Sequence, residues 1–139
     1  SPLSFKTDLG CVGVSVCFEI LYPFLIRKAV NHGAEFLVNI SNDAWFGVSP
    51  MPYIHLNAAR FRAVENRRYL LRASNSGISA IISPDGKILS RSDLFVCEEI
   101  AGQFLKLNQA TVYSRFGEII LYLCAGCVFI RLSWIILKT

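Results

Sequence analysis

The sequence predicts an α/β fold whose sheet begins with parallel strands and passes into a meander, followed by one C-terminal transmembrane helix. Apolar runs rich in β-branched residues flank a helical pattern within residues 11–41, at the length of a βαβ crossover. From residue 69 onward, turn residues separate shorter strands, which is typical of an antiparallel meander. Residues 119–137 form a long apolar run.

The composition indicates a protein in which a large share of the residues is buried or part of the chain is embedded in a membrane. The 139 residues are 53% hydrophobic and 17% charged, above and below the usual shares of globular domains. The net charge is +4, but the arginines gather within residues 60–72, which is too local for a nucleic-acid surface. We therefore expect no nucleic-acid partner.

The cysteines predict no disulfide framework. There are five, an odd number, and only Cys124 and Cys127 have the spacing of a metal-binding pair. These two lie inside the apolar run, where zinc is not expected. We therefore expect no metal site and no cofactor. Because the chain begins at Ser1 without a targeting segment, we interpret it as a fragment of a longer protein.

The first elements form a strand, a helix and a second strand. Residues 11–17 predict a buried strand that ends on the thiol of Cys17. Pro23 suits the first turn of a helix, and Gly33 supplies its stop. Residues 35–41 are a second apolar run. This order at this spacing favours two parallel strands joined by a crossover helix.

A loop and a second helix follow. Residues 42–52 carry turn residues and predict a loop, although Trp45 and Phe46 are bulkier than a solvent-exposed loop needs. We therefore expect something apolar to meet this loop. The next helix is predicted over residues 53–68, with its arginines facing away from an apolar stripe of Ile54, Ala58, Phe61 and Val64.

The remaining pattern divides the chain into two parts. Short strands are predicted at residues 69–74, 78–83 and 87–90, with a turn at 84–86. Residues 1–116 then form a partial α/β domain, and residues 117–139 form the transmembrane helix and a short cytoplasmic tail.

The apolar run at residues 119–137 has the features of a bilayer span. A span needs about 20 residues, and Tyr122 and Trp134 lie near its two ends with Lys138 beyond. Its only charge, Arg131, lies in the C-terminal third, where snorkelling reduces the cost of about 2.5–3.5 kcal/mol at a bilayer centre. The alternative is a buried helix that ends a soluble domain.

Cys17 is the strongest candidate for a reactive side chain. It ends a predicted strand, and the carboxyl ends of parallel strands border the crevice that binds ligands in α/β sheets. Free cysteine is also among the most buried residue types, so a packing role is the alternative. Glu19 is an acidic residue within an apolar stretch, and the backbone N–H of Phe18 at the strand end suits an oxyanion donor.

Four short motifs and a helix rich in His and Arg lie between Val12 and Gly117. The motifs are VGVSVCFEI at residues 12–20, SNDAWFG at 41–47, RASNSG at 72–77 and YSRFG at 113–117. The first resembles the nucleophile segment of the nitrilase superfamily. Together with the helix, the others are similar to apolipoprotein N-acyltransferases rather than to soluble amidases.

This resemblance implies the C-terminal half of a nitrilase-like α/β sandwich in the bacterial inner membrane, with the catalytic domain facing the periplasm. It implies that a membrane phospholipid gives a fatty acyl group to Cys17 as a thioester, and that the N-terminal amine of an apolipoprotein then accepts it. The Phe18 N–H would be an oxyanion donor and Glu19 a supporting carboxylate. Trp45 and Phe46 would shape the entry of the acyl chain.

This chain departs from the pattern of the family in two ways. The glutamate base and the lysine of the family lie upstream of the nucleophile segment and outside this chain, and the family commonly has tyrosine where Phe18 stands.

Two other functions stay open. One is a soluble nitrilase-type amidase or carbamoylase with the same thioester chemistry, and the other is a non-catalytic, truncated gene product.

Two further groups of residues have less certain roles. We interpret His55 as a hydrogen-bonded residue on a half-buried helix face rather than as a titrating catalytic group. Basic side chains of the second helix either bind lipid phosphate or only solvate a helix face. These are Arg60, Arg62, Arg67 and Arg68.

Overall fold

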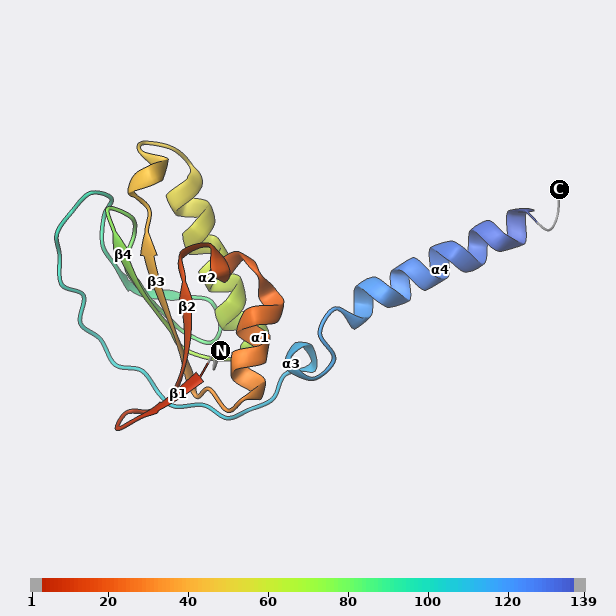
Figure 1. The fold of residues 1–139 in the computed structure, drawn as a ribbon, viewed down its shortest axis with the longest axis horizontal. Coiled ribbons are helices and arrows are strands. Elements are labelled where there is room, and N and C mark those ends of the chain that lie inside the picture. Colours follow the sequence, from red (N-terminus) through yellow and green to blue (C-terminus); the bar gives the residue numbers. More distant parts are fainter. Residues whose placement is uncertain (1–3, 137–139) are drawn as a thin grey trace.

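One mixed sheet organises the part of the chain that the computed structural model describes, residues 4–136 (Figure 1). Its six strands lie in sequence order: β1 (Ser4–Thr7), β2 (Gly10–Val16), β3 (Phe36–Asn42), β4 (Leu70–Asn75), β5 (Ala80–Ile82) and β6 (Ile88–Arg91). The α-helices are α1 (Pro23–Asn31), α2 (Met51–Asn66), α3 (Val112–Phe116) and α4 (Ile119–Ile136). Two short 3-10 helices, η1 (Cys17–Leu21) and η2 (Ala44–Phe46), follow β2 and β3.

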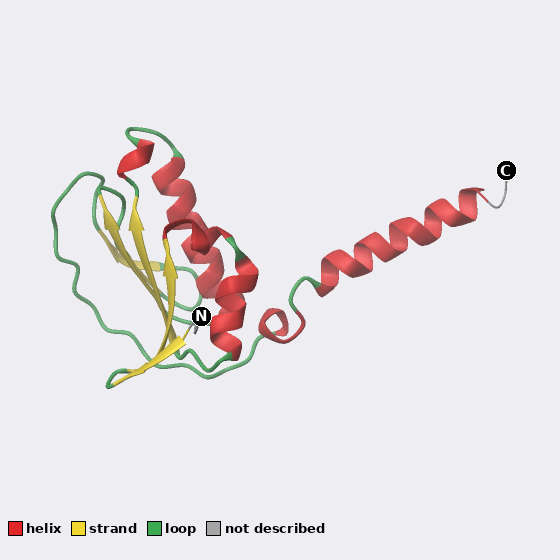
Figure 2. Cartoon of the chain, viewed as in Figure 1, coloured by secondary structure: helices red, strands yellow, loops and turns green. Residues whose placement is uncertain are grey.

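The strand directions confirm the predicted crossover and meander. β2, β3 and β4 run parallel, and α1 and α2 are the helices that connect them. β5 and β6 continue the sheet antiparallel. β1, which the sequence pattern did not reveal, pairs antiparallel with β2. Figure 2 shows α1 and α2 together on one face of this sheet.

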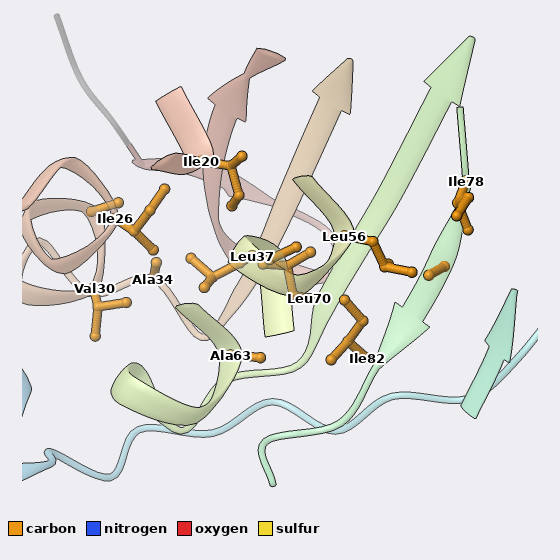
Figure 3. Close-up of a cluster of buried hydrophobic side chains, with 13 residues drawn as sticks. Ile20, Ile26, Val30, Ala34, Leu37, Leu56, Ala63, Leu70, Ile78 and Ile82 are labelled. Atoms are coloured by element: carbon orange, nitrogen blue, oxygen red, sulfur yellow. The ribbon is translucent and has the colours of Figure 1, made fainter. Parts of the chain in front are cut away.

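The hydrophobic core lies between these two helices and the sheet (Figure 3). Ile20, Leu70 and Ile82 are fully buried there, and burial of such a side chain contributes about 1.5–3 kcal/mol. Gly13 on β2 permits close packing, because a Cβ at this position would lie 2.9 Å from a methyl carbon of Leu37. The helix layer therefore sits tightly on the parallel strands that end at the candidate site.

The buried face of α2 differs from the predicted stripe. Ile54 and Phe61 of the predicted apolar stripe are 49% and 64% exposed, whereas Arg62 is buried, so the prediction that the arginines take the outer face is wrong for Arg62. The helix instead buries Pro52, His55, Leu56, Ala59, Arg62, Ala63 and Asn66. Each buried polar side chain of this face has at least one partner: His55 contacts Asp43, Arg62 donates to Glu65 over 2.9 Å, and Asn66 donates to the carbonyl of Arg62 over 2.9 Å. Hydrogen-bonding partners offset the cost of desolvation, which apolar periodicity alone does not register.

Arginine side chains hold the segment that leads to α4. Arg68 is buried and donates to the backbone carbonyls of Ala34 and Gln109 over 2.8 Å each. Arg27 on α1 donates to the carbonyl of Ser114 in α3 over 3.0 Å. Charged donors make stronger hydrogen bonds than neutral ones. The chain is thus fixed to the body of the domain just before α4 begins.

α4 extends away from the sheet and its helices (Figure 1). It covers 18 residues, from Ile119 to Ile136. Among residues 4–136, no helix reaches the combination of length and hydropathy that a bilayer crossing requires. Leu137, the last residue of the predicted span, lies outside the described residues.

Candidate active site

Cys17 occupies a sharp turn at the carboxyl end of β2. The strand ends at Val16, one residue earlier than predicted, and Cys17 begins η1. Its backbone φ is 51°, a left-handed value that costs energy for a residue with a Cβ and that persists only where surrounding structure imposes it. The thiol is half-buried. A strained, partly accessible side chain at this edge of a parallel sheet suits a nucleophile.

Glu19 folds back over the turn that carries Cys17. Its Oε2 accepts a hydrogen bond from the backbone N–H of Val16 over 2.7 Å. This contact spans the residues on both sides of the thiol and holds the turn closed. Phe18 lies inside the turn, in the first turn of η1, where backbone N–H groups have no partner within the helix.

A row of buried polar side chains crosses the three parallel strands just before they end. Ser15, Asn39 and Arg72 are direct register partners on β2, β3 and β4. Asn39 donates to the Ser15 hydroxyl over 3.1 Å and accepts from Nη1 of Arg72. Arg72 Nε also donates to the carbonyl of Ile78 over 3.2 Å. The row is therefore hydrogen-bonded from one strand to the next, beginning two residues before Cys17.

Asp43 joins this row to helix α2. Its Oδ2 lies 2.7 Å from Nη2 of Arg72 and its Oδ1 lies 3.3 Å from Nδ1 of His55, with both ion-pair partners fully buried. Ser41 also donates to Oδ1 over 2.5 Å. Burial alone would raise the pKa of Asp43, but the Ser41 hydroxyl, Arg72 and His55 outweigh it, so this pKa is lowered. Asp43 is therefore an ionised carboxylate at neutral pH.

The two basic partners of Asp43, His55 and Arg72, differ in charge. Burial lowers the pKa of His55, and Asp43 only partly opposes that shift, so the imidazole is neutral at neutral pH. Burial also lowers the pKa of Arg72, while the charge and hydrogen bond of Asp43 and the charge that Cys17 carries when ionised oppose this. Arginine stays protonated even so. The site thus holds one buried cation within electrostatic reach of Cys17.

Aromatic side chains close the site on the α2 side. The ring of His55 makes edge contacts with Phe18 at 4.9 Å and with Phe46 at 5.1 Å between centroids. Phe18 and Phe46 also touch each other, at 5.8 Å. Trp45, by contrast, is 88% exposed at the tip of the same loop. The structure therefore brings Phe46 and Phe18 together beside Cys17 and leaves Trp45 outward.

Gly77 leaves the space that Asp43 needs. A Cβ at this position would lie 2.8 Å from the Cβ of Asp43 and would also strike its carboxylate and the Ser74 hydroxyl. Real Cβ atoms do not approach other atoms this closely, so a larger residue would displace Asp43. The loop after β4 thus completes the same buried cluster.

Several of these residues were not singled out from the sequence. Asp43, Arg72, Asn39 and Ser15 lie within or beside the motifs, but no local pattern shows that they form one network. One usable signal was present: Asp43 directly follows an apolar strand, where polar residues of neighbouring parallel strands meet. His55 is hydrogen-bonded as interpreted, but it is fully buried rather than half-buried.

The arginines of α2 and of the segment that follows it are mostly committed to structural contacts. Arg62 in α2 pairs with Glu65, and Arg68 after the helix binds backbone carbonyls. Arg60 donates to the carbonyl of Gly86 over 2.9 Å. These contacts favour neither a phosphate-binding cluster nor a merely solvated helix face. Within residues 4–136, no three His, Cys, Asp or Glu side chains gather as a metal site requires.

Comparisons with known proteins agree with this arrangement. A model of the carbon-nitrogen hydrolase family matches residues 3–101. The chain is 42% identical over 123 residues to a protein named apolipoprotein N-acyltransferase from Geobacter metallireducens, covering 88% of this chain and 24% of that protein. It is 42% identical over 129 residues to one of the same name from Wigglesworthia glossinidia brevipalpis, covering 89% and 26%. The chain thus spans about a quarter of the length of these relatives.

Solved structures share the fold. Saccharomyces cerevisiae Nit3, a member of branch 10 of the nitrilase superfamily, superposes with a TM-score of 0.55 at 24% identity, over 66% of this chain and 36% of that one. A carbon-nitrogen hydrolase from Helicobacter pylori G27 gives a TM-score of 0.58 at 20% identity, over 64% and 38%. The α/β sheet described above is therefore a nitrilase-like fold.

Proposed function

This chain belongs to the carbon-nitrogen hydrolase family, and on that premise we propose that it carries the nucleophile of a lipoprotein N-acyltransferase. The observation that supports this most directly is Cys17, held at a strained turn between a buried polar network and an aromatic cluster. The names of its relatives support the acyl-transfer reaction. Because the chain spans about a quarter of the length of these relatives, we propose this activity for a longer enzyme that contains it.

The first half-reaction forms a thioester. The upstream base of the enzyme takes the proton of the Cys17 thiol, and the thiolate attacks the ester carbonyl of a phospholipid. The tetrahedral oxyanion collapses, the ester C–O bond breaks, and the lysophospholipid alcohol leaves with the proton that the base returns. A thiolate is a strong nucleophile and divides a difficult acyl transfer into two easier steps. The backbone N–H of Phe18 donates to the oxyanion. Glu19 supports the reaction by holding the turn, since its carboxylate already accepts the N–H of Val16.

The second half-reaction forms an amide. The N-terminal amine of an apolipoprotein attacks the thioester carbonyl, the C–S bond breaks, and Cys17 regains its thiol. The glutamate base and lysine that activate the nucleophile belong, on this proposal, to the upstream part of the enzyme. Trp45 and Phe46 shape the entry of the acyl chain, and the exposure of Trp45 supports contact with lipid.

We also propose that residues 119–137 anchor the enzyme in the bacterial inner membrane, with Cys17 on the periplasmic side. The support comes from the sequence and from the exposed side chains of α4, including Leu121 at 62%, Phe129 at 68% and Ile130 at 72%. So much exposed apolar surface is unfavourable in water and favourable in lipid.

The test is to trap the acyl-enzyme. The full-length protein is incubated with phospholipid but without an apolipoprotein acceptor, and the modified residue is located by mass spectrometry. We expect one fatty-acyl mass on Cys17 and none after Cys17→Ser. Cys97→Ser is the matched control, because Cys97 is an exposed free thiol away from the turn. Acylation of Cys97, or hydrolysis of small amides without any thioester from phospholipid, would contradict the proposal.

A further inference from the structure

His55 is a buried histidine whose two ring nitrogens have different surroundings. Its Nδ1 lies 3.3 Å from Oδ1 of Asp43, and because an ionised carboxylate only accepts hydrogen bonds, Nδ1 carries the proton. Its Nε2 is buried and has no hydrogen-bond partner within the described residues. An unsatisfied buried nitrogen is unfavourable, so the position of His55 needs a physical explanation.

The position of the ring supplies that explanation. His55 is in edge contact with both Phe18, the residue after the nucleophile, and Phe46, the neighbour of Trp45. The imidazole itself is fixed by Asp43, which Arg72 fixes in turn. A tethered ring can hold its two aromatic neighbours in place, whereas a free apolar ring in the same space can rotate or shift.

The contacts around Cys17 form a continuous path. It begins at Ser15, two residues before the thiol, and passes through Asn39, Arg72 and Asp43 to His55. From His55 it returns to Phe18, one residue after the thiol. The strained backbone of Cys17 is thus held from both sides by one network.

We propose that His55 is a positioning residue, which holds Phe18 and the loop of Phe46 so that the backbone around Cys17 keeps its reactive geometry. The proposal rests on the proposed function, because it assigns to His55 a role in the acylation of Cys17. His55 acts through Phe18 and touches no reacting atom itself. Its loss lets the oxyanion donor drift, and small misplacements of reacting groups cost about 100-fold in rate.

The experiment measures single-turnover thioester formation on Cys17 in the full-length enzyme with phospholipid vesicles. His55→Asn keeps a donor near the position of Nδ1 and removes the ring, while His55→Phe keeps a ring and removes the donor. We expect both variants to slow acylation at saturating phospholipid by tens-fold or more, with half-saturation within about twofold of wild type. A rise in half-saturation alone would overturn the proposal, because it indicates a role in binding.

Two controls separate positioning from stability. Leu56→Ala removes a core side chain next to His55 that is 4% exposed, so it lowers the thermal midpoint but leaves the acylation rate of the folded enzyme unchanged. A double-mutant cycle then combines His55→Asn with Phe18→Leu. If His55 acts through Phe18, its replacement changes the rate by less than about twofold in the Phe18→Leu background. Independent, multiplicative effects would overturn the proposal.

The outcomes also separate this proposal from the function on which it rests. If the wild-type enzyme forms no thioester on Cys17, the proposed function fails. If the wild-type enzyme forms it and both His55 variants form it at the wild-type rate, the proposed function stands and the positioning role fails.

Discussion

Removal of the buried guanidinium of Arg72 should lower the free energy of unfolding by a predictable amount. Arg72→Met deletes the partner that lies 2.7 Å from Asp43 while leaving a side chain of similar length. Asp43 is fully buried, so its charge would stay in the interior with only His55 and Ser41 as partners. Asn39 and the carbonyl of Ile78 would each lose a donor as well.

The magnitude follows from the burial of the pair. Breaking a buried ion pair by removing one partner costs about 3–5 kcal/mol, whereas an exposed pair contributes about 0–1 kcal/mol. A typical domain is stable by only about 5–15 kcal/mol. With a urea dependence of about 2 kcal/mol per M, the unfolding midpoint of Arg72→Met should fall by roughly 2 M. Asp43→Asn added to Arg72→Met should recover part of this loss, because an amide leaves no unpaired charge.

The assay is urea unfolding of the detergent-solubilised enzyme, in which proteolysis of the unfolded fraction reports the extent of unfolding at each urea concentration. Arg60→Met is the matched control, because Arg60 is exposed and binds the carbonyl of Gly86 from outside the core. We expect the control to lose less than about 1 kcal/mol. The reasoning is refuted if Arg72→Met costs no more than Arg60→Met, or if Asp43→Asn adds to the loss instead of offsetting it.

Four further predictions follow from the same features. Gly77→Ala should abolish acylation of Cys17 as well as lower the free energy of unfolding. Gly13→Ala, whose new methyl meets only apolar atoms, should lower the free energy of unfolding by about 1–3 kcal/mol and spare the acylation rate of the folded enzyme. The pKa of Asp43 is lowered on folding from its ordinary value of 3.8. The stability that this carboxylate contributes is therefore present above that value and is lost as the pH falls through the lower folded pKa. When the free energy of unfolding is measured against pH in the acid range, it should fall less steeply in Asp43→Asn than in the wild type. Of two reporter enzymes fused after Thr139, the one that works in the cytoplasm should be active and the one that works in the periplasm should be inactive. Activity of the periplasmic reporter would contradict the proposed topology. The 139-residue chain alone should transfer acyl groups more slowly than a version extended upstream, by roughly a thousandfold or more, because Cys17 would lack the base and the lysine with which it acts as a unit. Comparable rates would show that this chain holds its own base.

Local patterns predicted most of the fold. The β-branched run before Cys17, the proline at position 23 and the turn at residues 84–86 each act within a few residues, so they identified the crossover and the meander. β1 was missed because four residues with mostly exposed side chains carry little periodicity. The face of α2 was assigned wrongly because His55, Arg62 and Asn66 are polar yet buried. His55 pairs with Asp43 outside the helix, while Arg62 and Asn66 find partners within it.

The sequence by itself determined which residue types were available for chemistry: a cysteine at the end of a strand, an acidic residue two positions later, and aromatic residues in the next loop. Only the tertiary structure decided which of them meet. Ser15, Asn39 and Arg72 become neighbours because the parallel strands place them in register, and Asp43 reaches His55 because the first turns of α2 pack beside the residues that follow β3. Hydrogen bonds and ion pairs act over about 3–4 Å, and such distances between residues far apart in sequence depend on strand register and helix packing.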